Sequence, residues 1–291
     1  MSRKKYKISI FSLFRDSESY INECLRSLDE VELTTNADFE YFFYENDSKD
    51  NTSKILGDWI KGKRGKLLSE TANEQSHGST LEPNRMIKMA RIRNKMADLG
   101  KPVDSDYSIV IDSDLNFSKN IVNEFLKYKD LNFSMLTPNV RQTVPCKMNG
   151  KSETSYYDSL SLFDTENNHC MTWSDNPFYE DSDRNKFESG EPIHVNRAFG
   201  GFAFIKSNLF NKVNWKSSGN LEHWALCDQL NEHGKIYFLP EIRPTVNIKQ
   251  QQWEHESDVI AQQRYLLSDG WNRFLWKKGV GGLQLSNESQ N

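Results

Sequence analysis

Short apolar runs alternate with amphipathic stretches over the first 111 residues of the chain. The runs are rich in β-branched and aromatic residues, which predicts strands at 7–14, 39–44, 66–68 and 107–111. Between the runs, apolar residues recur at helical spacing, which predicts helices over 20–28, 51–60 and 84–99. This alternation predicts an α/β fold with a mostly parallel central sheet and helices on both faces.

The second half of the chain is less regular. Further elements are predicted as strands at 198–205 and 236–239 and a helix at 222–233. From 145 to 195, Asn, Asp, Ser and aromatic residues dominate, so we expect irregular structure, either a binding loop or a partly disordered insertion. We expect one domain over 1–279 and a flexible, Gly- and Ser-rich tail over 280–291.

Composition and charge narrow the functional classes. The 41 acidic residues outnumber the 37 basic ones, so no global basic excess drives nucleic-acid binding. No apolar run approaches the roughly 18–20 residues that a membrane helix needs. The four cysteines form no C-x-x-C pair, which argues against a zinc ribbon and indicates reduced thiols in a cytoplasmic protein.

Two carboxylates follow the most apolar predicted strand. Asp112 and Asp114 flank Ser113 directly after the run at 107–111, so their side chains converge on a small volume. Their repulsion is tolerated best around a divalent cation or a shared proton. In parallel sheets ligands bind beyond the carboxyl ends of strands, and a polar cluster at 45–50 stands at another such end. The alternative is an Asx turn that only closes the strand.

Two enzyme classes place Asp-x-Asp at a strand end. In haloacid-dehalogenase-type phosphatases the first Asp is a nucleophile, and the motif follows the first strand and continues with Thr or Val. Here the motif follows a later strand and continues with Leu115-Asn116. That placement is typical of GT-A-type nucleotide-sugar glycosyltransferases. The phosphatase alternative would use Asp112 as nucleophile, and a non-catalytic glycan-binding module is a third possibility.

Further segments, in the same order along the chain, resemble the GT-A family. They are the opening strand and turn at 8–16, the acidic segment at 45–52, the A-x-x-R-N helix at 90–94, the GG turn at 200–201, and the E-x-x-x-L-C and G-K-I segments at 222–227 and 234–236. His223 stands where many members have Asp. With that substitution, the chain is similar to the fungal, cryptococcal capsule-associated mannosyltransferase group.

The resemblance implies a nucleotide-binding half over 7–120 and an acceptor-binding half over 121–279. It implies a GDP-mannose or UDP-sugar donor, a glycan acceptor, and Mn²⁺ or Mg²⁺ bound by oxygen ligands. The donor-side residues would be Phe14, Arg15, Glu45, Asp47, Asp50, Arg85, Arg93, Asp112, Ser113, Asp114, Gly200 and Gly201. The aromatic residues of 145–195, with Trp173 foremost, would then border the acceptor.

Transfer with inversion also needs a base for the acceptor hydroxyl. Glu222 and His223 begin the helix predicted at 222–233 and are the candidates, although Glu222 in that position can also serve only the helix dipole. A retaining mechanism would remove this assignment. The metal would be held by Asp114 and by His255, which follows a strand-like stretch at 245–248, and His194 is a weaker candidate.

Overall fold

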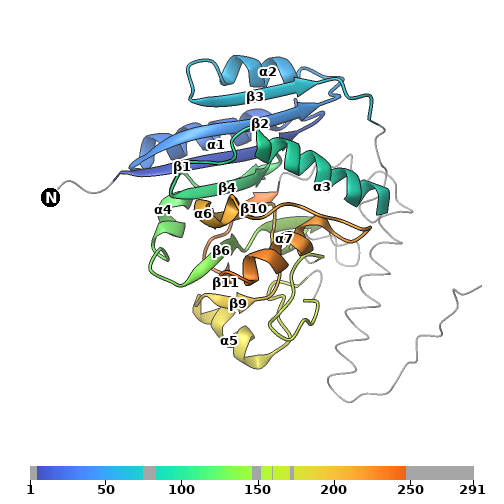
Figure 1. Ribbon diagram of the computed structural model, residues 1–291. Helices are drawn as coiled ribbons and strands as arrows, with labels where there is room; N and C mark the ends of the chain where they lie inside the picture. Colours follow the sequence, from blue (N-terminus) through green and yellow to red (C-terminus); the bar gives the residue numbers. More distant parts are fainter. Residues whose placement is uncertain (1–4, 75–82, 146–151, 159, 171–173, 247–291) are drawn as a thin grey trace, which may run out of the picture.

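The computed structural model describes residues 5–74, 83–145, 152–158, 160–170 and 174–246. Its main feature is an eight-stranded sheet in the order β3-β2-β1-β4-β10-β6-β11-β9 (Figure 1). The first half of the sheet consists of β1 (Tyr6–Phe14), β2 (Ala37–Asn46), β3 (Gly65–Glu70) and β4 (Tyr107–Asp112). All neighbours among these four are parallel, as the sequence pattern predicts.

The second half of the sheet is mixed. It contains β10 (Phe202–Lys206), β6 (Phe133–Pro138), β11 (Lys235–Leu239) and β9 (Ile193–Val195). Strand β10 runs antiparallel between β4 and β6, and β9 is antiparallel to β11, whereas β11 and β6 are parallel. Most strands therefore end at one edge of the sheet, and β10 begins there. The chain enters β10 through Gly200 and Gly201, so this strand starts later than the predicted 198–205.

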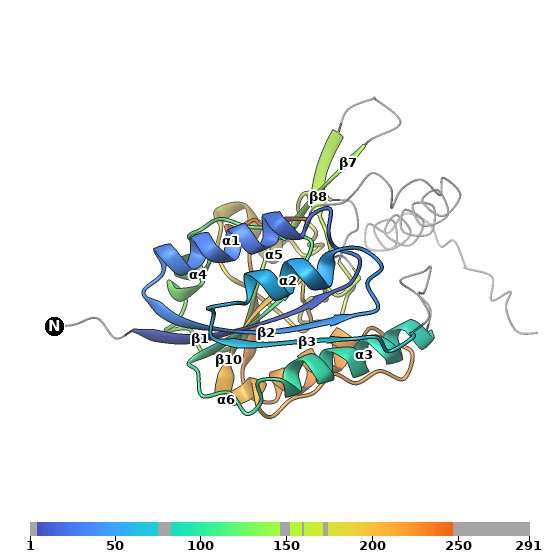
Figure 2. The same ribbon diagram turned by 90° about the horizontal axis from the view of Figure 1, so that it is seen from above.

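Helices cover both faces of the sheet, as the sequence predicts (Figure 2). One face carries α1 (Ile21–Thr34), α2 (Thr52–Trp59) and α4 (Ile121–Leu126). The other carries α3 (Pro83–Asp98), α6 (Ser207–Phe210) and α7 (Glu222–Asn231). Each face has its own buried apolar cluster. These two cores fix the shape of the sheet edge at which most strands end.

The segment from 145 to 195 has more regular structure than its composition predicts. It contains α5 (Asp181–Ser189), which contacts β9, and β8 (Ser152–Tyr156), which pairs with β7 (Arg141–Pro145) in a hairpin that projects from the domain in Figure 2. Helix α5 is mostly polar, but its Phe187 is buried and packs against Phe178 and Phe238. Two-residue strands β5 (Leu115–Asn116) and β12 (Thr245–Val246) complete a second, four-stranded sheet with the hairpin.

Some expectations fall outside the described residues. These are Trp173, His255 and the tail at 280–291, and only the first two residues of the stretch at 245–248 are described. Among the described helices, none combines the length and the apolar character that a membrane span requires. Strands from both predicted halves of the domain belong to the same eight-stranded sheet.

Candidate active site

The carboxyl end of β4 and the turn before β10 lie against each other. The backbone N–H of Asp112 donates to the carbonyl oxygen of Gly201 at 2.7 Å. Gly200 and Gly201 have φ angles of +63° and +72°, in the left-handed region that favours glycine. A Cβ atom on Gly201 would lie 3.3 Å from Oδ2 of Asp112. The two glycines therefore allow the backbone to approach the carboxylate closely.

Arg93 of α3 joins Asp112 to the start of α7. Its Nη2 donates to Oδ1 of Asp112 at 3.1 Å, and its Nε donates to Oε1 of Glu222 at 3.0 Å. Arg93 and Glu222 are 5% and 4% exposed, so both charges are buried and each depends on the other for compensation. The structure thus brings together three of the predicted site residues that lie far apart in the sequence.

His223 is enclosed on three sides. Its Nε2 lies 3.2 Å from Oε1 of Glu222, Nε1 of Trp215 donates to its Nδ1 at 3.3 Å, and the ring of Phe199 stacks on it at 3.6 Å between centroids. Burial lowers the pKa of His223, so the ring is neutral near pH 7. Because Nδ1 accepts a hydrogen bond, the ring proton is on Nε2, where it faces Glu222.

Glu222 remains ionised in this setting. Burial by itself favours the neutral acid, but Arg93 outweighs burial through its charge and its hydrogen bond and lowers the pKa of the carboxyl. The hydrogen bond from Arg93 falls on Oε1, and Nε2 of His223 lies 3.2 Å from the same oxygen. Glu222 is therefore a carboxylate that is ionised over the neutral pH range and held through Oε1 by Arg93.

The pKa of Asp114 is shifted in the opposite direction to that of Glu222. Burial, with the charge of Asp112 as a further cause, raises its pKa to about 7. The pKa of Asp112 is also raised by burial, although Arg93 opposes the shift. Two crowded carboxylates in this state are the oxygen donors that a hard divalent cation would stabilise. Within the described residues, no set of three or more His, Cys, Asp or Glu side chains is arranged around a common metal position.

The two histidines that the sequence offers as metal ligands are His255 and His194. His255 lies outside the described residues. His194 is in β9 and pairs with Tyr237 of β11, which places it four strands from β4 in the sheet. Asp114, with Asp112 beside it, is thus the described part of a possible metal site.

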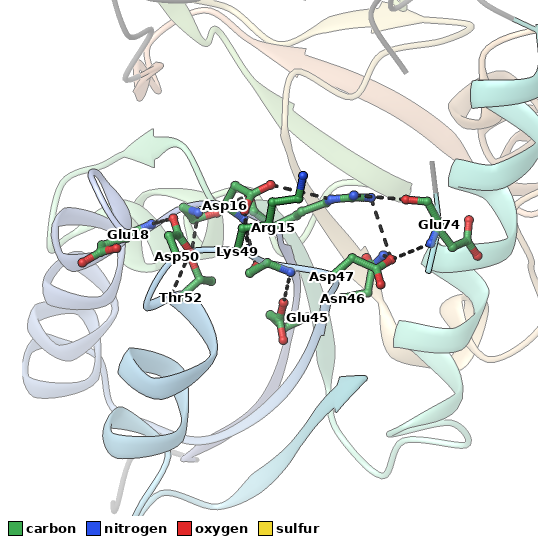
Figure 3. Close-up of polar contacts among 12 residues, drawn as sticks. Arg15, Asp16, Glu18, Glu45, Asn46, Asp47, Lys49, Asp50, Thr52 and Glu74 are labelled. Carbon is green, nitrogen blue, oxygen red and sulfur yellow. Dashed lines mark hydrogen bonds and ion pairs between the residues drawn. The ribbon is translucent and has the colours of Figure 1, made fainter. Parts of the chain in front are cut away.

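The turns after β1 and β2 form the other side of the site (Figure 3). Asp47 has a φ of +57°, and its carboxylate accepts hydrogen bonds from the backbone N–H groups of Asn73 at 2.8 Å and Glu74 at 3.1 Å. Arg15 donates from Nη2 to the carbonyl oxygen of Glu74 at 3.1 Å, and its Nη1 lies 4.0 Å from Oδ2 of Asp47. These two donor-side candidates hold the chain that follows β3.

Asp50 and Glu45, which we expected on the donor side, accept hydrogen bonds from turn amides. Asp50 accepts from the backbone N–H groups of Glu18 and Thr52, each at 3.0 Å, and so joins the starts of α1 and α2. Glu45 accepts from the backbone N–H of Ser48 at 3.0 Å and from the hydroxyl of Ser69. Both carboxylates shape the rim of the site, and any contact with a donor would be additional to these bonds.

Three further donor-side candidates lie in different surroundings. The Phe14 side chain is buried against Phe43, so it packs in the core and not at the surface of the site. Ser113 is buried and hydrogen-bonds to the phenol of Tyr20. Arg85 is half-buried on α3, and its charge opposes the burial that raises the pKa of Asp112, which indicates that it faces the site.

Two residues of the site had no signal in the sequence. Asp158 accepts hydrogen bonds from the backbone N–H of Gly200 at 3.0 Å and from the hydroxyl of Ser161, so it fixes the GG turn. Trp215 is buried although it lies in a polar stretch between α6 and α7. Neither residue belongs to a periodic pattern or to one of the motifs, and only the folded chain shows their contacts.

The sheet order, the Asp-Ser-Asp sequence that begins at the last residue of β4 and the GG turn before β10 are features of a glycosyltransferase of the GT-A type. Residues 7–233 match the family described as cryptococcal mannosyltransferase 1, and the chain belongs to this family. The family membership confirms the resemblance seen in the sequence and makes the protein a glycosyltransferase, which replaces the phosphatase and binding-module alternatives. No curated protein is significantly similar to the chain in sequence.

Solved structures confirm the fold. The chain is similar to residues 1–349 of TarS from S. aureus, with a TM-score of 0.51 and 14% identity over 97% of this chain and 76% of that one. The same fragment in complex with UDP-GlcNAc gives a TM-score of 0.51 and 15% identity over 93% and 73% of the two chains. At this level of identity the similarity establishes the shared GT-A architecture.

Proposed function

We propose that the protein transfers a sugar from a nucleotide-sugar donor to a hydroxyl of a glycan acceptor, with inversion at the transferred carbon and with Mn²⁺ or Mg²⁺. The observation that carries this proposal is the convergence of Asp112, Asp114 and Glu222 at one sheet edge. The first two are acids suited to a metal-bound diphosphate, and Glu222 is a buried, ionised carboxylate suited to accept a proton.

The donor would bind across the ends of β1, β2 and β4. Arg15 and Arg85 supply positive charge on this side, and guanidinium groups bind phosphate oxygens in bidentate fashion. The rim held by Glu45, Asp47 and Asp50 would contact the base and ribose. GDP-mannose is the first choice of donor because the family is named for a mannosyltransferase, and a UDP-sugar is the second.

Asp114, with Asp112 beside it, would hold the divalent cation, and His255 would add a further ligand. When bound, the cation neutralises negative charge that develops on the departing nucleoside diphosphate. Ser113 stays buried beneath these carboxylates and fixes the turn between them.

Glu222 would take the proton of the acceptor hydroxyl. The acceptor oxygen then forms a bond to C1 of the sugar as the bond from C1 to the diphosphate oxygen breaks, on the opposite face. His223 is the less suitable base, because Nδ1 accepts from Trp215 and Nε2 carries the proton that faces Glu222. We assign His223 the role of holding Glu222 in place.

The acceptor would lie along the GG turn and the segment that supports it. Gly200 and Gly201 leave open backbone beside Asp112, and Asp158 fixes this turn from the segment at 145–195. Tyr157 is half-buried next to Asp158 and provides an aromatic face close to the Asp112 and Asp114 carboxylates. Trp173 stays our candidate for stacking on the acceptor.

A panel of nucleoside diphosphates tests the donor and the metal together. Thermal unfolding is measured with GDP, UDP, ADP or CDP, each with and without Mn²⁺. We expect one nucleotide to raise the melting temperature, and to do so only with the metal present. The matching nucleotide sugar should then support transfer to mannose-containing oligosaccharides, and NMR of the product should show an inverted anomeric centre. Stabilisation by every nucleotide without metal, or retention of configuration, would contradict the proposal.

A further inference from the structure

We infer that Arg93 and its neighbour Asn94 act as positioning residues, which hold the base Glu222 at a fixed place relative to Asp112. This inference rests on the proposed function, because it concerns the same reaction. It assigns the Arg-Asn pair of α3 to the proton-accepting side of the site, whereas the sequence places Arg93 among the donor-binding residues.

The geometry of the guanidinium carries the first part. Arg93 donates through two different nitrogens, Nη2 to Asp112 and Nε to Glu222, at 3.1 and 3.0 Å. Since the donors of a guanidinium lie in one rigid plane, the two carboxylates are held at a defined separation and angle. One comes from the end of β4 and the other from the start of α7, so Arg93 links a strand of the central sheet to a helix packed on its face.

Asn94 holds the second residue of the Glu222-His223 pair. Its Nδ2 donates to the carbonyl oxygen of Trp215 at 2.8 Å, and its Oδ1 accepts from the backbone N–H of Trp215 at 2.9 Å. The indole Nε1 of Trp215 then donates to Nδ1 of His223. Arg93 thus fixes Glu222 directly, and Asn94 fixes His223 through Trp215.

Aromatic packing removes the remaining freedom of the pair. The guanidinium carbon of Arg93 lies 5.1 Å from the centroid of the Phe199 ring, which itself stacks on His223. Arg93 is nearly inaccessible, so it cannot leave this arrangement without leaving the buried carboxylate of Glu222 unpaired. These contacts favour a fixed structural relation over a side chain that moves to meet a ligand.

The charge balance supports the same conclusion. Asp112 and Glu222 together more than neutralise the single positive charge of Arg93, which leaves little attraction for a diphosphate. Of the three nitrogens of this guanidinium, Nη1 alone has no hydrogen-bond partner within the described part of the chain. Direct contact with the donor through Nη1 is therefore the competing role, and it predicts different kinetics.

The test is Arg93→Lys, which keeps the charge but donates from one point. If Arg93 positions Glu222, kcat falls roughly 10–100-fold while the donor KM and the nucleotide Kd stay within about threefold. Arg64→Lys makes the same chemical change in an exposed ion pair with Glu40 at the start of β3 and should leave all three constants unchanged. A rise in donor KM or nucleotide Kd with kcat preserved would overturn the inference in favour of direct donor binding.

A double-mutant cycle measures the coupling in kcat between Arg93 and Glu222, which a merely structural role of Arg93 would not produce. If Arg93 acts through Glu222, Arg93→Lys lowers kcat little further once Glu222→Gln is present, and additive losses would overturn the inference. Should Arg93→Lys fail to fold, Asn94→Ser replaces it, with a loss in kcat expected at unchanged nucleotide Kd. If the wild type transfers sugar but these variants keep full kcat, only the inference about Arg93 and Asn94 is wrong. If the wild type transfers no sugar, the proposed function is wrong as well.

Discussion

Asp114 is the residue on which the proposed metal site depends. Asp114→Asn keeps the shape of the side chain but supplies a neutral amide, which is a weak ligand for a hard cation. We expect Mn²⁺-dependent nucleotide binding to weaken by at least about 100-fold. The fold should persist, because the amide no longer repels Asp112. Calorimetric titration and thermal unfolding measure the two effects, and a variant with full Mn²⁺-dependent activity would exclude Asp114 as a ligand.

Glu222 is the residue on which the proposed base depends. Glu222→Gln keeps the size and can still accept a hydrogen bond from Arg93, but it cannot take a proton at neutral pH. Turnover should fall by roughly 10²–10⁴-fold, with donor affinity little changed. Glu232→Gln, at the exposed far end of α7, is the matched control and should be neutral. If His223→Asn proves far more damaging than Glu222→Gln, the base is His223.

At this scale the sequence indicated residue types better than it indicated their contacts. Asp112, Arg93 and Glu222 were all expected at the site, because strand-end position and family resemblance point to them. That Arg93 bridges the other two was not predictable, since the contact joins residues that are up to 129 positions apart. Asp158 and Trp215 were missed because loops carry no periodicity that would mark a buried side chain.

Among the elements, the GG turn is the most constrained. Gly201→Ala would force a side chain into a φ of +72° and place its Cβ 3.3 Å from both Asp112 and Leu115. We expect a loss of about 1–3 kcal/mol in the free energy of unfolding, measured by denaturant titration, and a fall in turnover as Asp112 shifts.

Gly57→Ala is the matched control for that variant. Gly57 lies inside α2, and an added Cβ would meet no atom within 4 Å. The same substitution should therefore stabilise the protein by about 0.5–1 kcal/mol, because alanine favours the helix. Equal effects of the two variants would show that the GG turn imposes no special backbone requirement.

The elements of the parallel half were predicted well, whereas several elements of the second half, among them α4 and β6, were missed. The strands of the parallel half and helices α2, α3 and α7 lie where apolar spacing places them. Helix α5 was missed because it buries only Asp183 and Phe187, so no apolar stripe runs along it. Strands β5 and β12 have two residues each, which is too short for any pattern to repeat.

For the whole molecule, the two cores predict how the thiols react. Cys24, Cys170 and Cys227 are buried thiols, and burial raises the pKa of Cys24 and of Cys227 to about 12. Because the thiolate is the reactive form, these groups should be inert in the native protein. In a Cys146→Ser variant at pH 8, a chromogenic disulfide reagent should detect almost no thiol before denaturation and three afterwards. Rapid reaction of the native variant would show that a core opens readily.

The antiparallel insertion of β10 has a consequence for how the chain is made. Strands β1 to β4 emerge from the ribosome in order and pair at once, but Ile111 of β4 meets its partner Phe202 only after about ninety further residues, or about 5–20 s of synthesis. Throughout that interval, YSIVI of β4 is an unpaired apolar edge, the kind of strand that recruits other chains into aggregates. The strand that ends in the acidic pair is thus also the point at which newly made protein is most exposed to misassembly.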